Sequence, residues 1–199
     1  MEANLDERRG RALVEESTRA GEGSRRHATD ATDARTTATA GTLGDARLLL
    51  LGMWLGAALL LSFAVAPGAF KVLPARELAG AIVSRTIAVV NVSGFVVALL
   101  LLATAFARRS VARARRAFVV ELCALALLAL ATGVGHWLIS ARMAALRTAM
   151  GRPVDEVAAS DPLRVAFNGL HGYSVVAMSA AMLAAVVAFI LVARRNRNA

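Results

Sequence analysis

The sequence has little of the residue types and motifs that mark several other classes of protein. It has one cysteine, Cys123, among 199 residues, which excludes an intrachain disulfide framework. It contains no P-loop, no G-x-S-x-G, no H-E-x-x-H, and no G-x-G-x-x-G after a strand-like run. These absences favour a non-enzymatic protein, although many membrane enzymes also lack such motifs.

Acidic residues are scarce in the apolar part of the chain. Up to Arg47 there are eight arginines and nine acids, but from residue 48 onward fifteen Lys or Arg face only five acids. Hydrophobic residues make up 57% of the sequence, above the roughly 45–50% of soluble domains. Basic residues that accompany long apolar sequence indicate a membrane protein with cationic loops rather than a nucleic-acid-binding protein.

Four long apolar runs contain no basic residue. They cover residues 48–66, 86–106, 117–139 and 173–193, and Glu121 is their only charged residue. About 20 helical residues cross a bilayer core, and a spanning segment must satisfy its backbone hydrogen bonds internally. We therefore predict an all-α fold, a bundle of four transmembrane helices over residues 46–199, with the lipid bilayer as its partner.

The distribution of basic residues predicts an orientation. From residue 47 onward, nine of the fifteen arginines are Arg47 itself or lie in the 108–116 loop and the C-terminal tail. These three regions lie on the same side of four consecutive spans. The positive-inside rule makes that side cytoplasmic, which predicts a multi-pass protein of the cytoplasmic membrane with both ends inside.

Residues 1–45 have no apolar periodicity and predict a disordered cytoplasmic tail. A docking role and translation from a misplaced start codon are alternatives for this tail.

Small residues recur where helices can approach closely. Gly52 and Gly56 form a G-x-x-x-G pair in the first run, and Gly169 and Gly172 flank His171 before the last run. Such spacing favours packing within the bundle. A homo-oligomer interface is the alternative.

Asp161 and Pro162 suit the N-cap and the first position of a helix that continues to residue 193. About 32 residues at ~1.5 Å each exceed a ~30 Å hydrocarbon core, so this helix should extend past the outer boundary.

Glu121 follows the basic loop closely, and its expected partners are the helix dipole and Arg115 or Arg116.

Polar residues gather toward the outer leaflet in all four predicted helices. Buried polar residues in a membrane often face a cavity, so this level predicts an outer-facing polar pocket. The alternative is that headgroups wet these residues and that no site exists. The candidates for the pocket or for structural hydrogen bonds are Asn91, His136, Arg164, Phe167, Asn168, His171 and Ser174.

His136 and His171 can lie at similar depth, and two such histidines can ligate haem or a transition metal. No further residue has metal-ligand spacing, so the first expectation is no cofactor, with this pair as the alternative.

Two separated motifs resemble one family of small membrane proteins. "LGMWLGAALLLSFAVAPGAFKVLP" and "DPLRVAFNGLHGYSV" are similar to segments of the family called domain of unknown function 4149, which resembles eukaryotic transmembrane protein 205. The matching positions of the second motif are Arg164, Phe167, His171, Gly172 and Ser174. The resemblance covers residues 46–193 and implies a four-helix multi-pass membrane protein without implying an activity. Asn168-Gly169 departs from the pattern as a softer helix start.

These observations lead to one functional hypothesis and two alternatives. The hypothesis is a non-enzymatic membrane protein whose outer-facing pocket binds or helps to move a small molecule. The first alternative is a haem- or metal-binding protein that uses His136 and His171. The second is a membrane enzyme that acts on lipid, which the lack of paired carboxylates or a nucleophile and base on that level disfavours.

Overall fold

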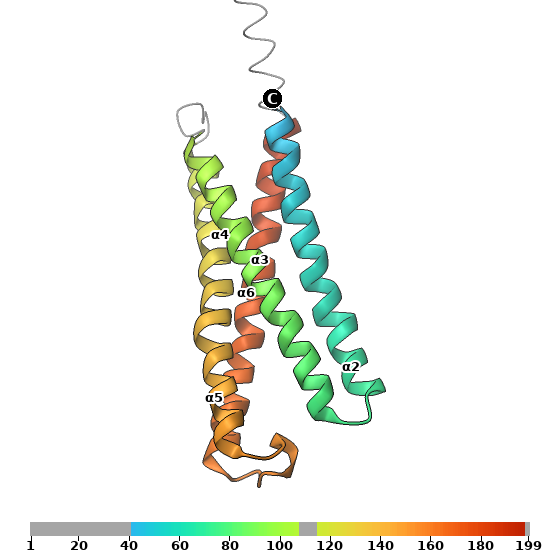
Figure 1. Cartoon of the computed structure of the whole chain (residues 1–199). Coiled ribbons are helices and arrows are strands. Elements are labelled where there is room, and N and C mark those ends of the chain that lie inside the picture. The colour runs from blue at the N-terminus through green and yellow to red at the C-terminus, as the bar shows by residue number, and fades with distance from the viewer. Residues whose placement is uncertain (1–40, 108–114, 198–199) are drawn as a thin grey trace, which may run out of the picture. The chain divides into compact units, whose positions relative to one another are not determined.

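The computed structural model describes residues 41–107 and 115–197, and these residues form helices and short connections without a strand. Four helices are long and apolar enough to cross a membrane. They run Gly41–Val72, Arg76–Phe106, Arg115–Met150 and Pro162–Arg197. Residues Ala46–Ala199 belong to one compact unit, in which the helices run up and down (Figure 1). The predicted all-α, four-helix fold is confirmed.

Each helix is longer than the apolar run inside it. The helices contain 31 to 36 residues, which corresponds to roughly 46–54 Å of length. A bilayer core is only ~30 Å thick, so all four helices must extend beyond it. Helix α3 (Arg76–Ala107) and helix α6 (Pro162–Arg197) carry these extensions without a break. Residues outside the hydrocarbon can therefore still be held on rigid helices.

The last helix begins where its sequence predicts. Asp161 accepts a hydrogen bond at Oδ1 from the backbone N–H of Leu163, at 2.8 Å, and Pro162 is the first residue of α6. An aspartate at the N-cap satisfies an N–H group that has no partner within the helix. The connection from α5 (Ala141–Met150) to α6 contains Gly151, at φ 62°, and the short 3-10 helix η4 (Val154–Glu156).

Two of the four long helices contain a π-helical segment. In the first, η1 (Leu61–Val65) precedes α2 (Ala66–Val72); in the third, α4 (Arg115–Gly133) is followed by η3 (Val134–Ser140) and α5 (Ala141–Met150). Pro67 is the second residue after η1, and a proline ring inside an α-helix would clash with the carbonyl four residues earlier. The wider π turn lets the Ala66 N–H bond to the Leu61 carbonyl and the helix continue.

The core of the compact unit is built largely from leucine and alanine. Ala181, Ala185 and Ala188 of α6 are fully buried, while many large residues, such as Phe63 and Leu183, are exposed. Small residues let helices approach, and the exposed large side chains suit contact with lipid tails. The closest approach lies at Gly94, where an added Cβ would be 2.5 Å from Trp54 Nε1. Trp54 Nε1 donates to the Val90 carbonyl at 2.9 Å, which joins the first helix to α3.

Of the predicted tail, residues 1–45, the structure describes only residues 41–45. Residues 1–40 of this tail lie outside the described residues. The remaining part, 41–45, is helical and continues into the first membrane-length helix. Glycine and aspartate are tolerated in the first turn of a helix, which allows the helix to begin before the apolar run.

Candidate functional site

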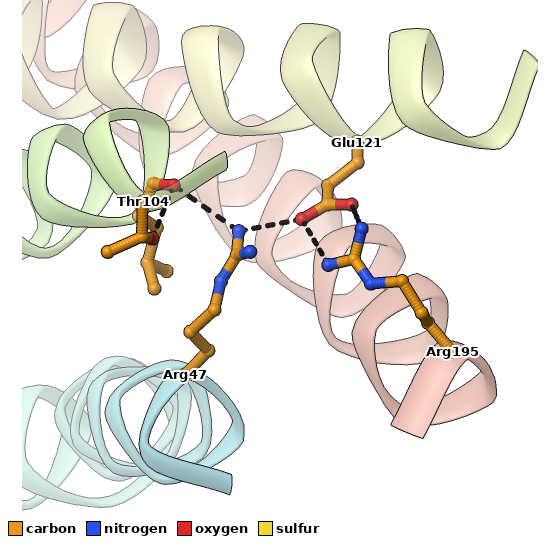
Figure 2. A network of polar contacts seen from close by, with 5 residues as sticks. Arg47, Thr104, Glu121 and Arg195 are labelled. Atoms are coloured by element: carbon orange, nitrogen blue, oxygen red, sulfur yellow. Dashed lines mark hydrogen bonds and ion pairs between the residues drawn. The ribbon is translucent and has the colours of Figure 1, made fainter. Parts of the chain in front are cut away.

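A buried ionic cluster connects the helices at one end of the bundle, called here the Arg47 end. Arg47 Nη2 donates to Glu121 Oε1 at 2.7 Å, and Arg195 Nη1 donates to Glu121 Oε2 at 2.9 Å. Arg195 Nη2 also reaches Glu121 Oε1 at 3.1 Å, so this pair is bidentate (Figure 2). The three residues come from the first helix, α4 and α6.

Helix α3 joins the same cluster through its backbone. Arg47 Nη2 donates to the Leu101 carbonyl at 3.2 Å, and the Thr104 hydroxyl donates to that carbonyl at 2.9 Å (Figure 2). The side chains of Arg47 and Glu121 are each 2% exposed, whereas that of Arg195 is 37% exposed. One carboxylate thus neutralises a buried guanidinium and holds a partly solvated one. The cluster fixes all four helices to one another at this end.

The expected pairing of Glu121 with Arg115 or Arg116 is wrong. Both arginines are exposed, and the carboxylate pairs with Arg47 and Arg195 instead. The reason is helical geometry: residues three or four apart share a face, whereas Glu121 follows these arginines by six and five positions. Glu121 therefore points into the bundle while Arg115 and Arg116 point away from it.

A second polar region lies midway along α3. Asn91 is 4% exposed, and its carboxamide makes no hydrogen bond within the part of the chain that the structure describes. It packs against η3: a Cβ added to Gly135 would be 3.1 Å from Asn91 Nδ2. A buried amide without a partner costs roughly 1–3 kcal/mol. Asn91 is therefore a polar side chain of the bundle interior that a hydrogen-bonding partner would stabilise.

His136 follows Gly135 directly and shares this feature. Its ring is half-buried, and its buried Nδ1 atom finds no hydrogen-bond partner among residues 41–107 and 115–197. The π-helical segment η3 contains both residues, and the Ser140 hydroxyl donates to the Gly135 carbonyl at 2.8 Å. π segments within α-helices occur frequently at functional sites. Asn91 and His136 thus border the same short backbone segment, and we call this pair the Asn91–His136 site.

Two other hydroxyl groups near the Asn91–His136 site, those of Thr132 and Ser93, donate hydrogen bonds within their own helices. Thr132 is buried and donates to the Leu128 carbonyl at 2.7 Å, and Ser93 donates to the Val90 carbonyl at 3.0 Å. Such local bonds satisfy a hydroxyl in an apolar environment without a tertiary partner. These two residues therefore add polarity to the level but leave no donor group in need of a ligand.

The remaining candidates of the last helix are spread over different environments. His171 and Asn168 are exposed, and Ser174 is half-buried. A Cβ added to Gly169 or Gly172 would meet nothing within 4 Å in the described structure. The two glycines therefore make no close helix contact within the described part of the chain, and a contact between copies stays a prediction.

The G-x-x-x-G pair of the first helix shows a similar pattern. A Cβ added to Gly52 would be 3.6 Å from the Phe189 ring, an ordinary contact. One added to Gly56 would meet nothing within 4 Å in the described residues. The tight approach that the motif suggests occurs at Gly94 instead. Whether Gly52 and Gly56 pack against a second copy is left open as a prediction.

Arg164 and Phe167 lie at the opposite end of the bundle from the ionic cluster. Arg164 Nη1 donates to the Val157 carbonyl, and Phe167 is 9% exposed. The Arg147 guanidinium lies over the Phe167 ring, with Cζ 5.1 Å from the centroid, and both of its terminal nitrogens contact Ser84 Oγ at 3.2 Å. Sequence reasoning found Arg164 and Phe167 through a motif but missed Arg147 and Ser84.

In the described ranges, no three His, Cys, Asp or Glu residues cluster as metal ligands would. Haem or metal ligation by the two residues His136 and His171 needs only a pair and stays a prediction. Haem would give a Soret absorption band in the purified protein that His171→Ala abolishes.

Comparison with known proteins identifies the family. The model of the family described as "Domain of unknown function (DUF4149)" matches residues 49–152, just over half of the chain. The chain belongs to the DUF4149 family. This match contains the first apolar run, α3, α4 and α5, and therefore both residues of the Asn91–His136 site. No curated protein and no solved structure matches the chain. The resemblance to transmembrane protein 205 stays a prediction.

Proposed function

We propose that this DUF4149 protein binds, or helps to move, a small molecule at the Asn91–His136 site, without catalysing a reaction on it. The observation that carries the proposal is the buried Nδ1 atom of His136, which has no hydrogen-bond partner in the described residues and belongs to the helix segment that contacts the buried Asn91. Polar side chains inside a membrane protein are costly and commonly mark a ligand pathway. A ligand that hydrogen-bonds to these side chains would offset the cost.

The hydrogen-bonding groups of Asn91 and His136 indicate the kind of ligand that this site can bind. A carboxamide offers two N–H donors and one acceptor oxygen, and a neutral imidazole offers one donor and one acceptor. Neither group carries a fixed charge, and within residues 41–107 and 115–197 no ion pair joins His136 to an acid. The site therefore suits a neutral, hydrogen-bonding molecule better than an ion. Nothing at this site pairs a nucleophile with a base, which supports binding rather than chemistry.

The orientation of the protein follows from its basic residues. Arg115, Arg116, Arg194 and Arg197 lie at the helix ends that form the Arg47 end of the bundle. The positive-inside rule makes this end cytoplasmic, in the cytoplasmic membrane, with both chain ends inside. The third membrane-length helix then leaves the cytoplasm at Arg115 and ends outside at Met150, which puts His136 in its outer half. The proposed site therefore opens to the outer side.

The first experiment identifies a bound molecule. The full-length protein is purified from its membranes in mild detergent, and native mass spectrometry measures any retained mass. Asn91→Leu should abolish that mass because it removes the buried amide. Asn168→Leu is the matched control, since Asn168 is exposed on α6 and should retain it. An equal loss in both variants, or no retained mass in the native protein, would contradict a ligand at this site.

The second experiment tests access from water. Cys123 is first replaced by alanine, and a single cysteine is introduced at His136 or at Leu138. Leu138 lies in the same π-helical segment but is 49% exposed on the apolar surface. A membrane-impermeant thiol reagent added outside should modify His136→Cys and not Leu138→Cys. Modification of Leu138→Cys alone would show that the His136 position does not open to water.

A further inference from the structure

We propose that Arg147 and Arg164 form an oxyanion-binding site that accepts a phosphate group, where α5, α6 and α3 meet at the end of the bundle opposite the Arg47 end. Ser84 and the face of Phe167 complete the site. This site is separate from the Asn91–His136 site and does not depend on the proposed function. It rests on how few partners the two guanidinium groups have.

Arg147 contacts both Ser84 and Phe167, and Arg164 lies on the same helix as Phe167. Arg147 contacts Ser84 of α3 through both terminal nitrogens, and its Cζ lies 5.1 Å from the ring centroid of Phe167 in α6. Arg164 precedes Phe167 by three residues in the same helix, so the two side chains leave α6 on a common face. Stacking on the ring and the serine contact hold the Arg147 fork in a fixed direction.

The hydrogen-bond inventory leaves a surplus of donors. A guanidinium has five N–H groups. Within residues 41–107 and 115–197, Arg147 uses two of them on Ser84, and Arg164 uses one on the Val157 carbonyl. Arg164 Nε is buried and has no partner in the same residues. Both side chains are half-buried, where an unmatched cation is costly.

Within the described residues, Arg147 and Arg164 lack the carboxylate partners that other arginines have. Arg47 and Arg195 share Glu121, and the exposed Arg76 faces Asp155 at 3.7 Å. No carboxylate of the described structure forms an ion pair with Arg147 or Arg164. Arg147 lies in the last turn of α5, where the helix dipole offsets part of its charge, but Arg164 lies in the first turn of α6, where the dipole opposes it.

An oxyanion meets these requirements. A phosphate group offers several acceptor oxygens to the N–H groups of two guanidinium forks, in charge-assisted hydrogen bonds. The position is also suitable: Arg164 lies nine residues before the apolar run 173–193, or ~13 Å along the helix. Arg147 lies eight residues after the run 117–139, or ~12 Å. At that distance from the hydrocarbon, the phosphate can come from a lipid headgroup or from solution.

The test measures binding of two named probes to the full-length protein. Inorganic phosphate is titrated by calorimetry in an uncharged detergent, in buffer without phosphate. Phosphatidylglycerol retention is measured by lipid mass spectrometry after reconstitution into vesicles of one part phosphatidylglycerol and four parts phosphatidylcholine. The variants are Arg147→Met and Arg164→Met, which keep an apolar stem. Arg142→Met is the matched control, since Arg142 is an exposed arginine of α5.

We expect both site variants to weaken binding about tenfold or more, which corresponds to ~1.4 kcal/mol, and Arg142→Met to leave it unchanged. Loss of phosphate binding would identify a soluble oxyanion as the ligand. Loss of phosphatidylglycerol retention alone would identify a lipid headgroup. No saturable binding of either probe, or an equal effect of Arg142→Met, would overturn the proposal.

A measurement on the unmodified protein covers the case in which a variant does not fold. Phenylglyoxal reacts with accessible arginines, and peptide mapping follows the reaction at each position. Inorganic phosphate or phosphatidylglycerol should slow the reaction at Arg147 and Arg164 relative to Arg142. Equal rates at all three positions, with and without the probes, would also overturn the proposal.

Discussion

Replacing Glu121 by glutamine should strongly destabilise the bundle, because it removes the buried carboxylate that Arg47 and Arg195 share. The side chains of Arg47 and Glu121 are each 2% exposed, and Arg47 Nη2 lies 2.7 Å from Glu121 Oε1. Removing one partner of a buried ion pair typically costs about 3–5 kcal/mol. Glu121→Gln keeps the shape of the side chain, so a cavity adds little to this figure. We therefore expect a loss of about 3–5 kcal/mol in the free energy of unfolding.

Two other substitutions in the same cluster should lower the free energy of unfolding by less than Glu121→Gln does. The Arg195 side chain is 37% exposed, and solvent screens its pair with Glu121. Arg195→Gln should therefore cost only about 1 kcal/mol or less, as for surface pairs. Thr104→Val is a further control, since its hydroxyl bonds only to a carbonyl one turn away. It should change stability by well under the Glu121→Gln value, since the local bond contributes about 1 kcal/mol.

The assay is reversible unfolding of the purified protein in mixed detergent micelles, followed by circular dichroism. The double variant Arg47→Met with Glu121→Leu removes both buried charges, and apolar replacement of such a pair is often neutral or stabilising. It should recover most of the stability lost in Glu121→Gln. The reasoning is refuted if Arg195→Gln costs as much as Glu121→Gln, or if the double variant is no more stable than Glu121→Gln.

Three further outcomes follow from the packing and the charges. Gly94→Ala should destabilise by about 1–3 kcal/mol, because its Cβ would lie 2.5 Å from Trp54 Nε1, whereas Gly56→Ala should be neutral or stabilising in the same unfolding assay. Asp161→Ala removes the N-cap of α6 and should cost about 1 kcal/mol in that assay; no change would argue against the cap. In a cysteine-free background, Ser110→Cys should react with an impermeant thiol reagent only from the cytoplasmic side, and labelling from outside would reverse the orientation.

The fold was predictable because the bilayer imposes a simple requirement. A spanning segment needs about 20 apolar residues in helical form, and four such runs are visible by inspection. The start of α6 was predictable for a local reason, since Asp161 and Pro162 act within one turn. The π segments were not predicted: Pro67 shows that the first helix is perturbed but not how the neighbouring turn responds, and no proline lies within η3.

For the candidate sites, too, residues with a local sequence signal were predictable, whereas contacts between residues far apart in the sequence were not. Asn91 and His136 were identified because a polar residue in an apolar run is conspicuous in the sequence itself. The partners of Glu121 were not, because Arg47 and Arg195 are each 74 residues away and the nearer arginines were the natural choice. Arg147 was missed for a related reason: an arginine in a polar connection attracts no notice until its neighbours are known. The sequence of a membrane protein therefore reveals where polarity is unusual, while the structure reveals which charges are matched and which still require a partner.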